Sequence, residues 1–267
     1  MSVSIGFIGA GNMAGAIING ILAHTTHDHI IAYDIDRAKC ERFGDRVTYC
    51  ASLEQLACSS QYLFFAVKPQ VIDSVLEELS KLSIDWTQKI LISMVAGIST
   101  EYIAKSLPGN DLAVIRIMPN TPIMLGCGTT GICANAYTSP EQIQFVKSLL
   151  RGASSVYDIS EEQMNPSINM NGSSPAYLFL FAKAAVDYAK TEGMDEKIAL
   201  HMFADTMIGS AKMLTESGMD PQALIDMVTS PGGTTLAALR EFEACEFEKT
   251  IHQAMKACTK RAYELGK

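Results

Sequence analysis

Short apolar runs alternate with amphipathic stretches through the first half of the chain. The apolar runs predict strands at residues 3–8, 30–33, 47–49, 62–67, 90–93 and 112–118. Apolar residues at helical spacing predict intervening helices at residues 13–22, 53–57, 71–82 and 100–105. Nearly continuous apolar strands that alternate with helices are typical of a parallel sheet covered on both faces.

The next segment is expected to extend this α/β region. The glycine-rich patch at residues 126–131 predicts another strand with turns. A helix is expected at residues 140–150 with Ser139 as its N-cap, and a last strand at residues 155–159.

The pattern changes after about Ser160, where strand-like runs end. Helices are predicted at residues 176–191, 196–217, 221–228, 235–243 and 247–265. We therefore expect an α/β domain over residues 1–160 and an all-helical domain over residues 161–267. Helices this apolar often bury one side against a second subunit.

Composition narrows the class of protein. The net charge of -8 argues against non-specific nucleic-acid binding, which needs a basic face. No secretory signal is visible, and apolar runs such as residues 62–67 are too short to span a bilayer. The seven cysteines form no Cys-x-x-Cys pair, which indicates reduced thiols and a cytoplasmic protein. No metal is expected, because a polar loop explains the cluster of His24, His27 and His29.

A glycine turn carries the first candidate chemistry. Gly9-Ala10-Gly11 follows a strand ending at Ile8, and a helix begins at Asn12 or Met13. Gly9 permits the tight turn, Gly11 lets a pyrophosphate approach, and Ala14 keeps helix and strand close. The helix N-terminus supplies free N–H groups. The cofactor-binding residues expected here are Ile8, Gly9, Gly11, Asn12, Met13 and Ala14; a merely tight strand–helix turn is the alternative.

Asp34 ends the second predicted strand, where a dinucleotide fold places the acid that binds the adenosine ribose. This predicts an N-terminal Rossmann-type doubly wound sheet. A carboxylate there favours NADH, yet Arg37 and Lys39 could pair with the 2′-phosphate of NADPH. Both NADH and NADPH are therefore kept as candidate cofactors.

Two further strand ends should line the cofactor crevice. The first is the turn Ala66, Val67, Lys68 and Pro69, in which Lys68 could also be an ordinary exposed lysine. The second carries Met118 and Asn120, within a segment that could instead be a structural proline turn.

Two loops in the second half suit an anionic substrate. Ser230–Thr235 (Ser-Pro-Gly-Gly-Thr-Thr) ends one helix and opens the next, so its backbone N–H groups and hydroxyls suit a carboxylate. A plain interhelical turn is the alternative. Residues 172–175 start another helix, where Ser173 or Ser174 could simply be a cap.

In order and spacing, these motifs resemble pyrroline-5-carboxylate reductases, the enzymes of the last step of proline synthesis. The resemblance rests on residues 9–14, 67–69, 116–122 (Arg-Ile-Met-Pro-Asn-Thr-Pro), 171–177 (Asn-Gly-Ser-Ser-Pro-Ala-Tyr) and 226–235, and covers essentially the whole chain.

The resemblance implies hydride transfer from NADPH or NADH to a cyclic imine, which gives L-proline. It implies that the loop binds the substrate carboxylate and that Thr235, the catalytic candidate, hydrogen-bonds the substrate nitrogen. The substrate-binding residues expected are Ser230, Gly232, Gly233, Thr234, Thr235, Asn120 and Ser174. It also implies an interwoven homodimer, with dimers often assembling further. Asn171 departs from the usual Ser or Thr of the family, and its larger amide could alter the pocket.

Two other functions compete with this interpretation. A 3-hydroxy acid dehydrogenase would share the N-terminal turn, but it needs a lysine shortly after Gly172, and Lys183 is too far along. A protein that binds the cofactor without catalysis would not need an intact substrate loop.

Overall fold

The computed structural model describes residues 3–24 and 29–266, so His27 lies outside the described residues. The chain divides into two compact units. Unit 1 comprises Met1–Pro175 with Cys258–Lys267, and unit 2 comprises Ala176–Ala257. This division falls after Pro175 rather than near Ser160, and it assigns the C-terminal segment to the first unit.

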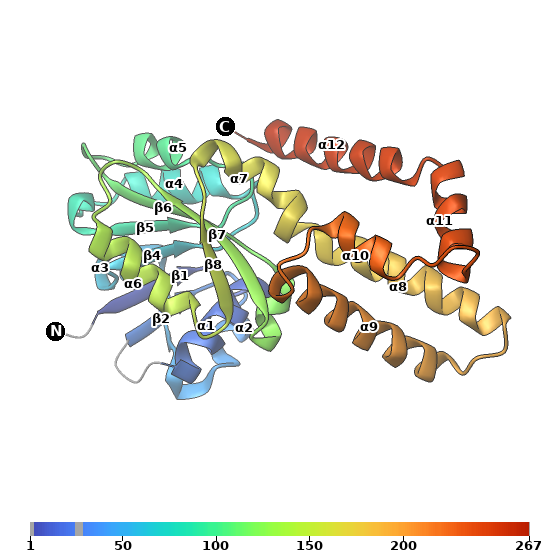
Figure 1. Ribbon diagram of the computed structural model, residues 1–267. Coiled ribbons are helices and arrows are strands. Elements are labelled where there is room, and N and C mark those ends of the chain that lie inside the picture. Colours follow the sequence, from blue (N-terminus) through green and yellow to red (C-terminus); the bar gives the residue numbers. More distant parts are fainter. Residues whose placement is uncertain (1–2, 25–28, 267) are drawn as a thin grey trace. The chain divides into compact units, whose positions relative to one another are not determined.

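Unit 1 is built on one eight-stranded sheet of order β3-β2-β1-β4-β5-β6-β7-β8 (Figure 1). Its strands are β1 (Ser4–Ile8), β2 (His29–Tyr33), β3 (Thr48–Tyr49), β4 (Tyr62–Phe65), β5 (Ile90–Ser93), β6 (Ala113–Pro119), β7 (Gly128–Ala134) and β8 (Ser154–Asp158). The strand order reverses between β1 and β4, so a crevice opens at the carboxyl ends of these two strands.

Helices cover both faces of this sheet, which confirms the predicted Rossmann-type layers. The helices are α1 (Asn12–His24), α2 (Ala38–Glu41), α3 (Leu53–Ser59), α4 (Ile72–Ser80), α5 (Thr100–Ser106), α6 (Pro140–Leu150) and α7 (Glu161–Ser167). One buried core joins α1 and α6 to Phe7 and Phe64, whose rings stack 4.5 Å apart. The other joins α3, α4 and α5 to Ile8 and Leu63. Neighbouring strand residues point to opposite faces, so a sheet with two covered faces needs apolar residues throughout.

The sheet is not wholly parallel. β7 pairs antiparallel with β6 and parallel with β8. A short 3₁₀ helix, η3 (Thr121–Leu125), reverses the chain, and Gly126 ends it at φ 72°, a backbone conformation that favours glycine. The glycine-rich patch therefore begins with a turn, and its strand begins at Gly128.

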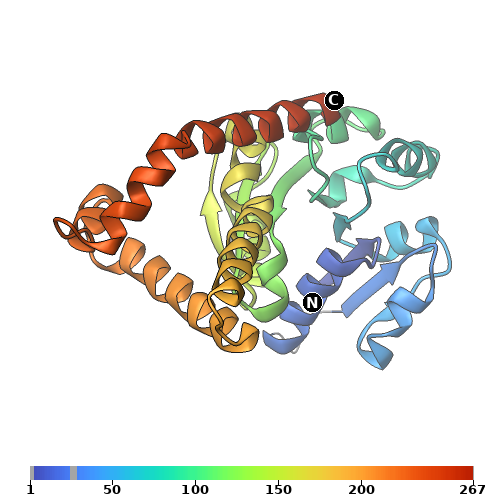
Figure 2. The same cartoon turned by 90° about the vertical axis from the view of Figure 1, so that its right-hand side faces the viewer.

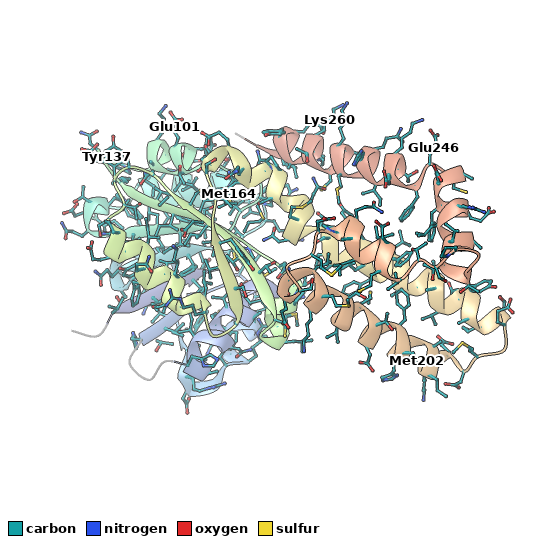
Figure 3. The ribbon with its side chains drawn as sticks, in the orientation of Figure 1. Glu101, Tyr137, Met164, Met202, Glu246 and Lys260 are labelled. Atoms are coloured by element: carbon teal, nitrogen blue, oxygen red, sulfur yellow. The ribbon has the colours of Figure 1, made fainter. Side chains whose placement is uncertain are left out.

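The predicted all-helical region begins with a helical segment at residues 161–172, where no individual helix was predicted. This segment consists of α7 and the π-helix η4 (Ile168–Gly172). Arg116, almost fully buried on β6, donates to the Glu161 carboxylate and, over 2.9 Å, to Asn165 Oδ1. Met164 of α7 is also fully buried (Figure 3). Tertiary packing, a half-buried ion pair and a capping box of Ser160 with Gln163 therefore hold this short segment, which contains Pro166.

Unit 2 contains helices, with no strand anywhere in residues 176–257 (Figure 2). They are α8 (Ser174–Thr191), which begins in unit 1, α9 (Glu196–Glu216), α10 (Pro221–Met227), α11 (Thr234–Ala244) and α12 (Phe247–Leu265), which ends in unit 1. These bounds agree with the predicted helices to within two residues.

Most large apolar side chains of unit 2 are exposed. Leu180 and Phe179 on α8 are 68% and 64% exposed, and Met202 on α9, labelled in Figure 3, is 59% exposed. Apolar faces of this extent mark interaction surfaces in water-exposed proteins.

Candidate active site

The turn between β1 and α1 has the geometry of a pyrophosphate cradle. Gly9 adopts φ 95°, and a Cβ there would lie 2.6 Å from the Ala66 carbonyl oxygen. Gly11 differs, because a Cβ added there meets nothing within 4 Å. The open space over Gly11 and the first N–H groups of α1 fit the pyrophosphate of a dinucleotide.

The contact between Gly9 and Ala66 also joins two predicted motifs. Ala66 N donates to the Ile8 carbonyl over 2.9 Å, so the β4 end lies beside the glycine turn. The strand ends at Phe65, earlier than predicted, and Ala66–Pro69 forms the following turn. Val67 and Pro69 are half-buried there, and Lys68 is exposed.

Asp34 lies directly behind the glycine turn and is only 9% exposed. Its carboxylate accepts from Ala10 N over 2.9 Å, from Asp36 N over 2.9 Å and from Lys39 Nζ over 3.2 Å. Burial alone would raise the pKa of this carboxyl, but the three hydrogen bonds and the lysine charge outweigh burial and lower the pKa. Asp34 is therefore an anion that holds the turn in place.

Arg42 contacts the glycine turn, and the sequence analysis did not identify it. Its Nη2 donates to the Ala10 and Gly11 carbonyls over 2.9 and 3.0 Å. No motif marks it, because it lies about thirty residues from the turn in an ordinary polar segment. Residues 94–97 follow the end of β5, and Met94 N donates to the Phe65 carbonyl at the end of β4 over 3.2 Å.

The end of β6 is held by amide side chains. Asn120, 7% exposed, bonds Thr129 twice, through Nδ2 to Oγ1 over 2.9 Å and through Oδ1 to the backbone N over 2.8 Å. Asn171 of η4 donates to the Met118 carbonyl, and its Oδ1 has no partner among the described residues. Asn171 thus ties η4 to the strand end that carries Met118.

Ser174 is not an N-cap of α8. Its Oγ donates back to the Met170 carbonyl over 3.0 Å, and Ser173 has α-helical backbone angles. The π-helix continues into α8 with helical geometry, so no capped start exists at this position. The Ser174 hydroxyl already has one backbone partner.

The loop before α11 in unit 2 is a tight turn. Gly233 N donates to the Ser230 carbonyl over 3.0 Å, and Gly232 adopts φ 73°. Pro231 and Gly232 occupy the central positions, which is the pattern of a type II turn. A Cβ on Gly233 would lie 2.5 Å from Ser230 Oγ and 3.1 Å from the Ser230 carbonyl oxygen, so a side chain here would displace the Ser230 hydroxyl.

The turn leaves the start of α11 without a side-chain cap. Gly233 is the N-cap, with no side-chain hydrogen bond, and the helix runs for 11 residues from Thr234. Within the described residues, no hydrogen bond is found for the hydroxyls of Ser230, Thr234 or Thr235. The first-turn N–H groups and three hydroxyls therefore suit a carboxylate.

The other chemical groups do not suggest a different site. Burial raises the pKa of the Cys133 thiol to about 12, with the Glu161 carboxylate adding to the effect. Burial likewise raises the pKa of Cys40 to about 11. Both thiols stay protonated near neutral pH and are poor nucleophiles.

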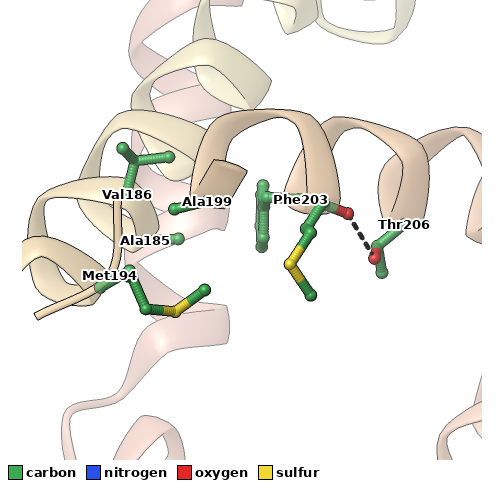
Figure 4. Close-up of a pocket in the computed structure, with 8 residues that line it drawn as sticks. Ala185, Val186, Met194, Ala199, Phe203 and Thr206 are labelled. Carbon is green, nitrogen blue, oxygen red and sulfur yellow. Dashed lines mark hydrogen bonds between the residues drawn. The ribbon is translucent and has the colours of Figure 1, made fainter. Parts of the chain in front are cut away.

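A cavity of about 260 Å³ lies between α8 and α9 in unit 2 (Figure 4). Val186, Met194, Ala199 and Phe203 line it, and Thr206 Oγ1 is bound to the Met202 carbonyl. Its lining is mostly apolar and holds no titratable group. Among the described residues, no cluster of metal-ligating side chains and no helix able to cross a membrane is found.

Comparison with known proteins assigns both halves of the chain. Residues 161–265 match the family described as pyrroline-5-carboxylate reductase dimerisation, and residues 4–97 match NADP oxidoreductase, coenzyme F420-dependent. The chain is 36% identical to the pyrroline-5-carboxylate reductase of Escherichia coli (strain K12) over the full length of both proteins. It is 38% identical to that of Haemophilus influenzae, covering 98% of this chain and 97% of the relative.

Solved structures agree. A 1-pyrroline-5-carboxylate reductase from Streptococcus pyogenes is 32% identical, covers 98% of each chain and has a TM-score of 0.89. The Plasmodium falciparum pyrroline carboxylate reductase with NADP bound is 25% identical, covers 99% of this chain and 98% of its own, and also has a TM-score of 0.89. The chain therefore belongs to the pyrroline-5-carboxylate reductase family and is an NAD(P)H-dependent oxidoreductase.

Proposed function

We propose that this protein reduces L-1-pyrroline-5-carboxylate to L-proline, with the start of α11 holding the substrate. The observation that carries this proposal is the uncapped helix start behind the Ser230–Gly233 turn. It occurs in a chain whose other unit carries an open glycine turn.

The substrate carboxylate binds at the N–H groups of the first turn of α11. An 11-residue helix places partial positive charge at this end, and anions are stabilised there. Gly233 contributes no side chain that competes for these groups. The hydroxyls of Ser230 and Thr234 supply further donors.

Thr235 orients the imine nitrogen. A protonated imine carbon is already electrophilic, so the protein mainly needs to position it and exclude water. The Thr235 hydroxyl has no partner among the described residues and can bond the substrate nitrogen. A threonine hydroxyl is a weak acid, so orientation is its role. The bound NADH or NADPH supplies the hydride.

The cofactor is held by the glycine turn and the neighbouring strand ends. Gly9, Gly11, Asn12, Met13 and Ala14 surround the pyrophosphate, and Ala66–Pro69 with Met118 line the crevice. Asn120 supports this edge through Thr129.

The protein acts as a homodimer in the cytoplasm. The dimerisation family and the exposed apolar faces of unit 2 support self-association. All seven cysteines are free thiols, the state that a reducing compartment maintains.

The test is proline formation from pyrroline-5-carboxylate with NADH or NADPH. We expect turnover with at least one cofactor, and Thr235→Ala to lower kcat/KM about 100-fold, the usual cost of one transition-state hydrogen bond. Thr250→Ala is the matched control, because that exposed hydroxyl only bonds the Glu246 carbonyl.

Three outcomes separate the parts of the proposal. Thr235→Ser should recover most of the rate, since it keeps the hydroxyl. Absence of proline formation with either cofactor would contradict the function. An unchanged rate for Thr235→Ala would contradict only the role of that residue.

A further inference from the structure

The end of the crevice that receives the adenosine ribose is acidic. Asp34 and Asp36 flank Ile35 directly after β2. A carboxylate offers about four lone-pair positions, and Asp34 uses three of them. One position therefore remains for a ribose hydroxyl. Asp36 is exposed, so a second negative charge lies beside the same position.

Each of the three cations that follow Asp34 already has a partner. Lys39 bonds Asp34 over 3.2 Å and lies 3.9 Å from Asp36. Arg37 Nε bonds Glu41 over 2.7 Å, and its guanidinium lies 5.1 Å from the centre of the Tyr49 ring. Arg42 donates to the backbone carbonyls of the glycine turn.

The next cation along the chain, Arg46, lies at the opposite end of the strands from Asp34. Arg46 precedes β3, which pairs parallel to β2 with Thr48 opposite Ile31. Arg46 therefore lies toward the amino ends of these strands, whereas Asp34 follows the carboxyl end of β2. Among the described residues that follow β2, a 2′-phosphate beside Asp34 would therefore meet two carboxylates and cations that already have partners.

Ile35, the residue between Asp34 and Asp36, also offers no group that could bind a phosphate. Ile35 is 93% exposed, which leaves a large apolar side chain at the rim without a packing role. A branched aliphatic side chain there can contact the face of an adenine, but it cannot donate to a phosphate.

We infer that this site selects NADH over NADPH, with Asp34 accepting from the unsubstituted ribose and Asp36 repelling a 2′-phosphate. The inference rests on the cofactor site proposed above. The relative whose structure holds NADP is 25% identical to this chain, so its bound nucleotide does not fix the preference of this site.

Direct binding separates this preference from the activity. Dissociation constants for NADH and NADPH can be measured by nucleotide fluorescence, and those for 5′-AMP and 2′,5′-ADP by calorimetry. We expect NADH to bind about tenfold or more tightly than NADPH, and 5′-AMP more tightly than 2′,5′-ADP, because like charges oppose each other. Equal binding, or tighter binding of NADPH, would overturn the preference and leave the reductase function intact.

Two variants test the stated causes. Asp36→Ser should tighten NADPH binding severalfold and leave NADH binding nearly unchanged. Glu41→Gln should also favour NADPH, because it releases Arg37 from its partner. Glu101→Gln is the matched control, since it removes an equivalent exposed i,i+4 acid that pairs with Lys105.

Two results would contradict the roles given to Asp36 and to the cofactor site. If Asp36→Ser weakens NADPH and NADH equally, Asp36 does not discriminate against the phosphate. If the wild-type protein binds neither nucleotide, the cofactor site itself is wrong, and the preference falls with it.

Discussion

The two helix starts that we propose as binding sites differ in how they are supported. The N-terminus of α1 lies against a buried sheet edge, where Asp34, Arg42 and the Ala66 carbonyl all contact the glycine turn. The N-terminus of α11 follows an exposed turn in unit 2, whose helices leave Leu180, Met202 and many other apolar side chains exposed. The contacts that support the glycine turn all lie within its own unit, whereas the start of α11 belongs to a unit with extensive exposed apolar faces.

The largest test of this comparison disrupts the partner surface. Leu180→Glu places a charge on the exposed apolar face of α8. Burial of an unpaired charge costs several kcal/mol, so we expect the dimer dissociation constant to rise about 1,000-fold (~4 kcal/mol). Sedimentation equilibrium measures this shift, and proline formation should fall with it.

Nucleotide binding should survive that change, because the glycine turn is built within unit 1. Lys183→Ala is the matched control, since Lys183 is an exposed residue of the same helix, paired only with Asp187. An unaltered dimer in Leu180→Glu would show that this face does not mediate self-association.

The second test compares two glycines of the same turn. Gly9→Ala should lower the free energy of unfolding by about 2 kcal/mol, because φ 95° and the contact with Ala66 both oppose a Cβ. Gly11→Ala should leave stability within about 0.5 kcal/mol, because its Cβ meets no protein atom.

Of the two variants, Gly11→Ala is the one in which NADH binding should change through direct contact with the nucleotide. Gly11→Ala should weaken NADH binding about tenfold, equivalent to a loss of ~1.4 kcal/mol, because the methyl group occupies the space of the pyrophosphate. Denaturant unfolding and nucleotide titration measure the two effects. A destabilised Gly11→Ala protein with normal NADH binding would contradict the cradle.

The smallest expected effect concerns the anion behind the turn. Asp34→Asn should cost about 1 kcal/mol at pH 7, because hydrogen bonds to a charged acceptor exceed those to a neutral one. The folded-state pKa of Asp34 is lowered, so its stabilisation is present above the unfolded-state pKa and is lost as pH falls through the folded-state pKa.

The difference in unfolding free energy between wild type and Asp34→Asn should therefore shrink on acidification. Urea titrations at several pH values between neutrality and strong acid measure it. A difference that does not change with pH would show that the Asp34 charge does not support the turn.

Local chemistry made much of this molecule predictable. A glycine with positive φ, a Pro-Gly pair and uninterrupted apolar strands each restrict the backbone over a few residues, so their positions could be predicted from neighbouring residues alone. The helix over residues 140–150 with its Ser139 cap is a further case, because its capping box lies within four residues. The antiparallel direction of β7 had no such local signal. The helix α7 did have one, because Ser160 and Gln163 form a capping box at its start, but the sequence analysis did not use it.

The sequence by itself therefore determined the glycine turn, the acid after β2, and the Ser230–Thr235 loop before α11. Only the tertiary structure decided what surrounds them. In the folded chain, the Ala66 carbonyl lies against Gly9 and the Asp34 carboxylate accepts from Ala10 N. Arg37 pairs with Glu41, Lys39 pairs with Asp34, and Arg42 donates to the Ala10 carbonyl. The ion pairs of Arg37 with Glu41 and of Lys39 with Asp34 are local. The contacts of Ala66, Asp34 and Arg42 with the glycine turn join residues far apart in the chain, and their geometry depends on the packed sheet. Whether Arg42 is free for a phosphate is for that reason a property of the fold.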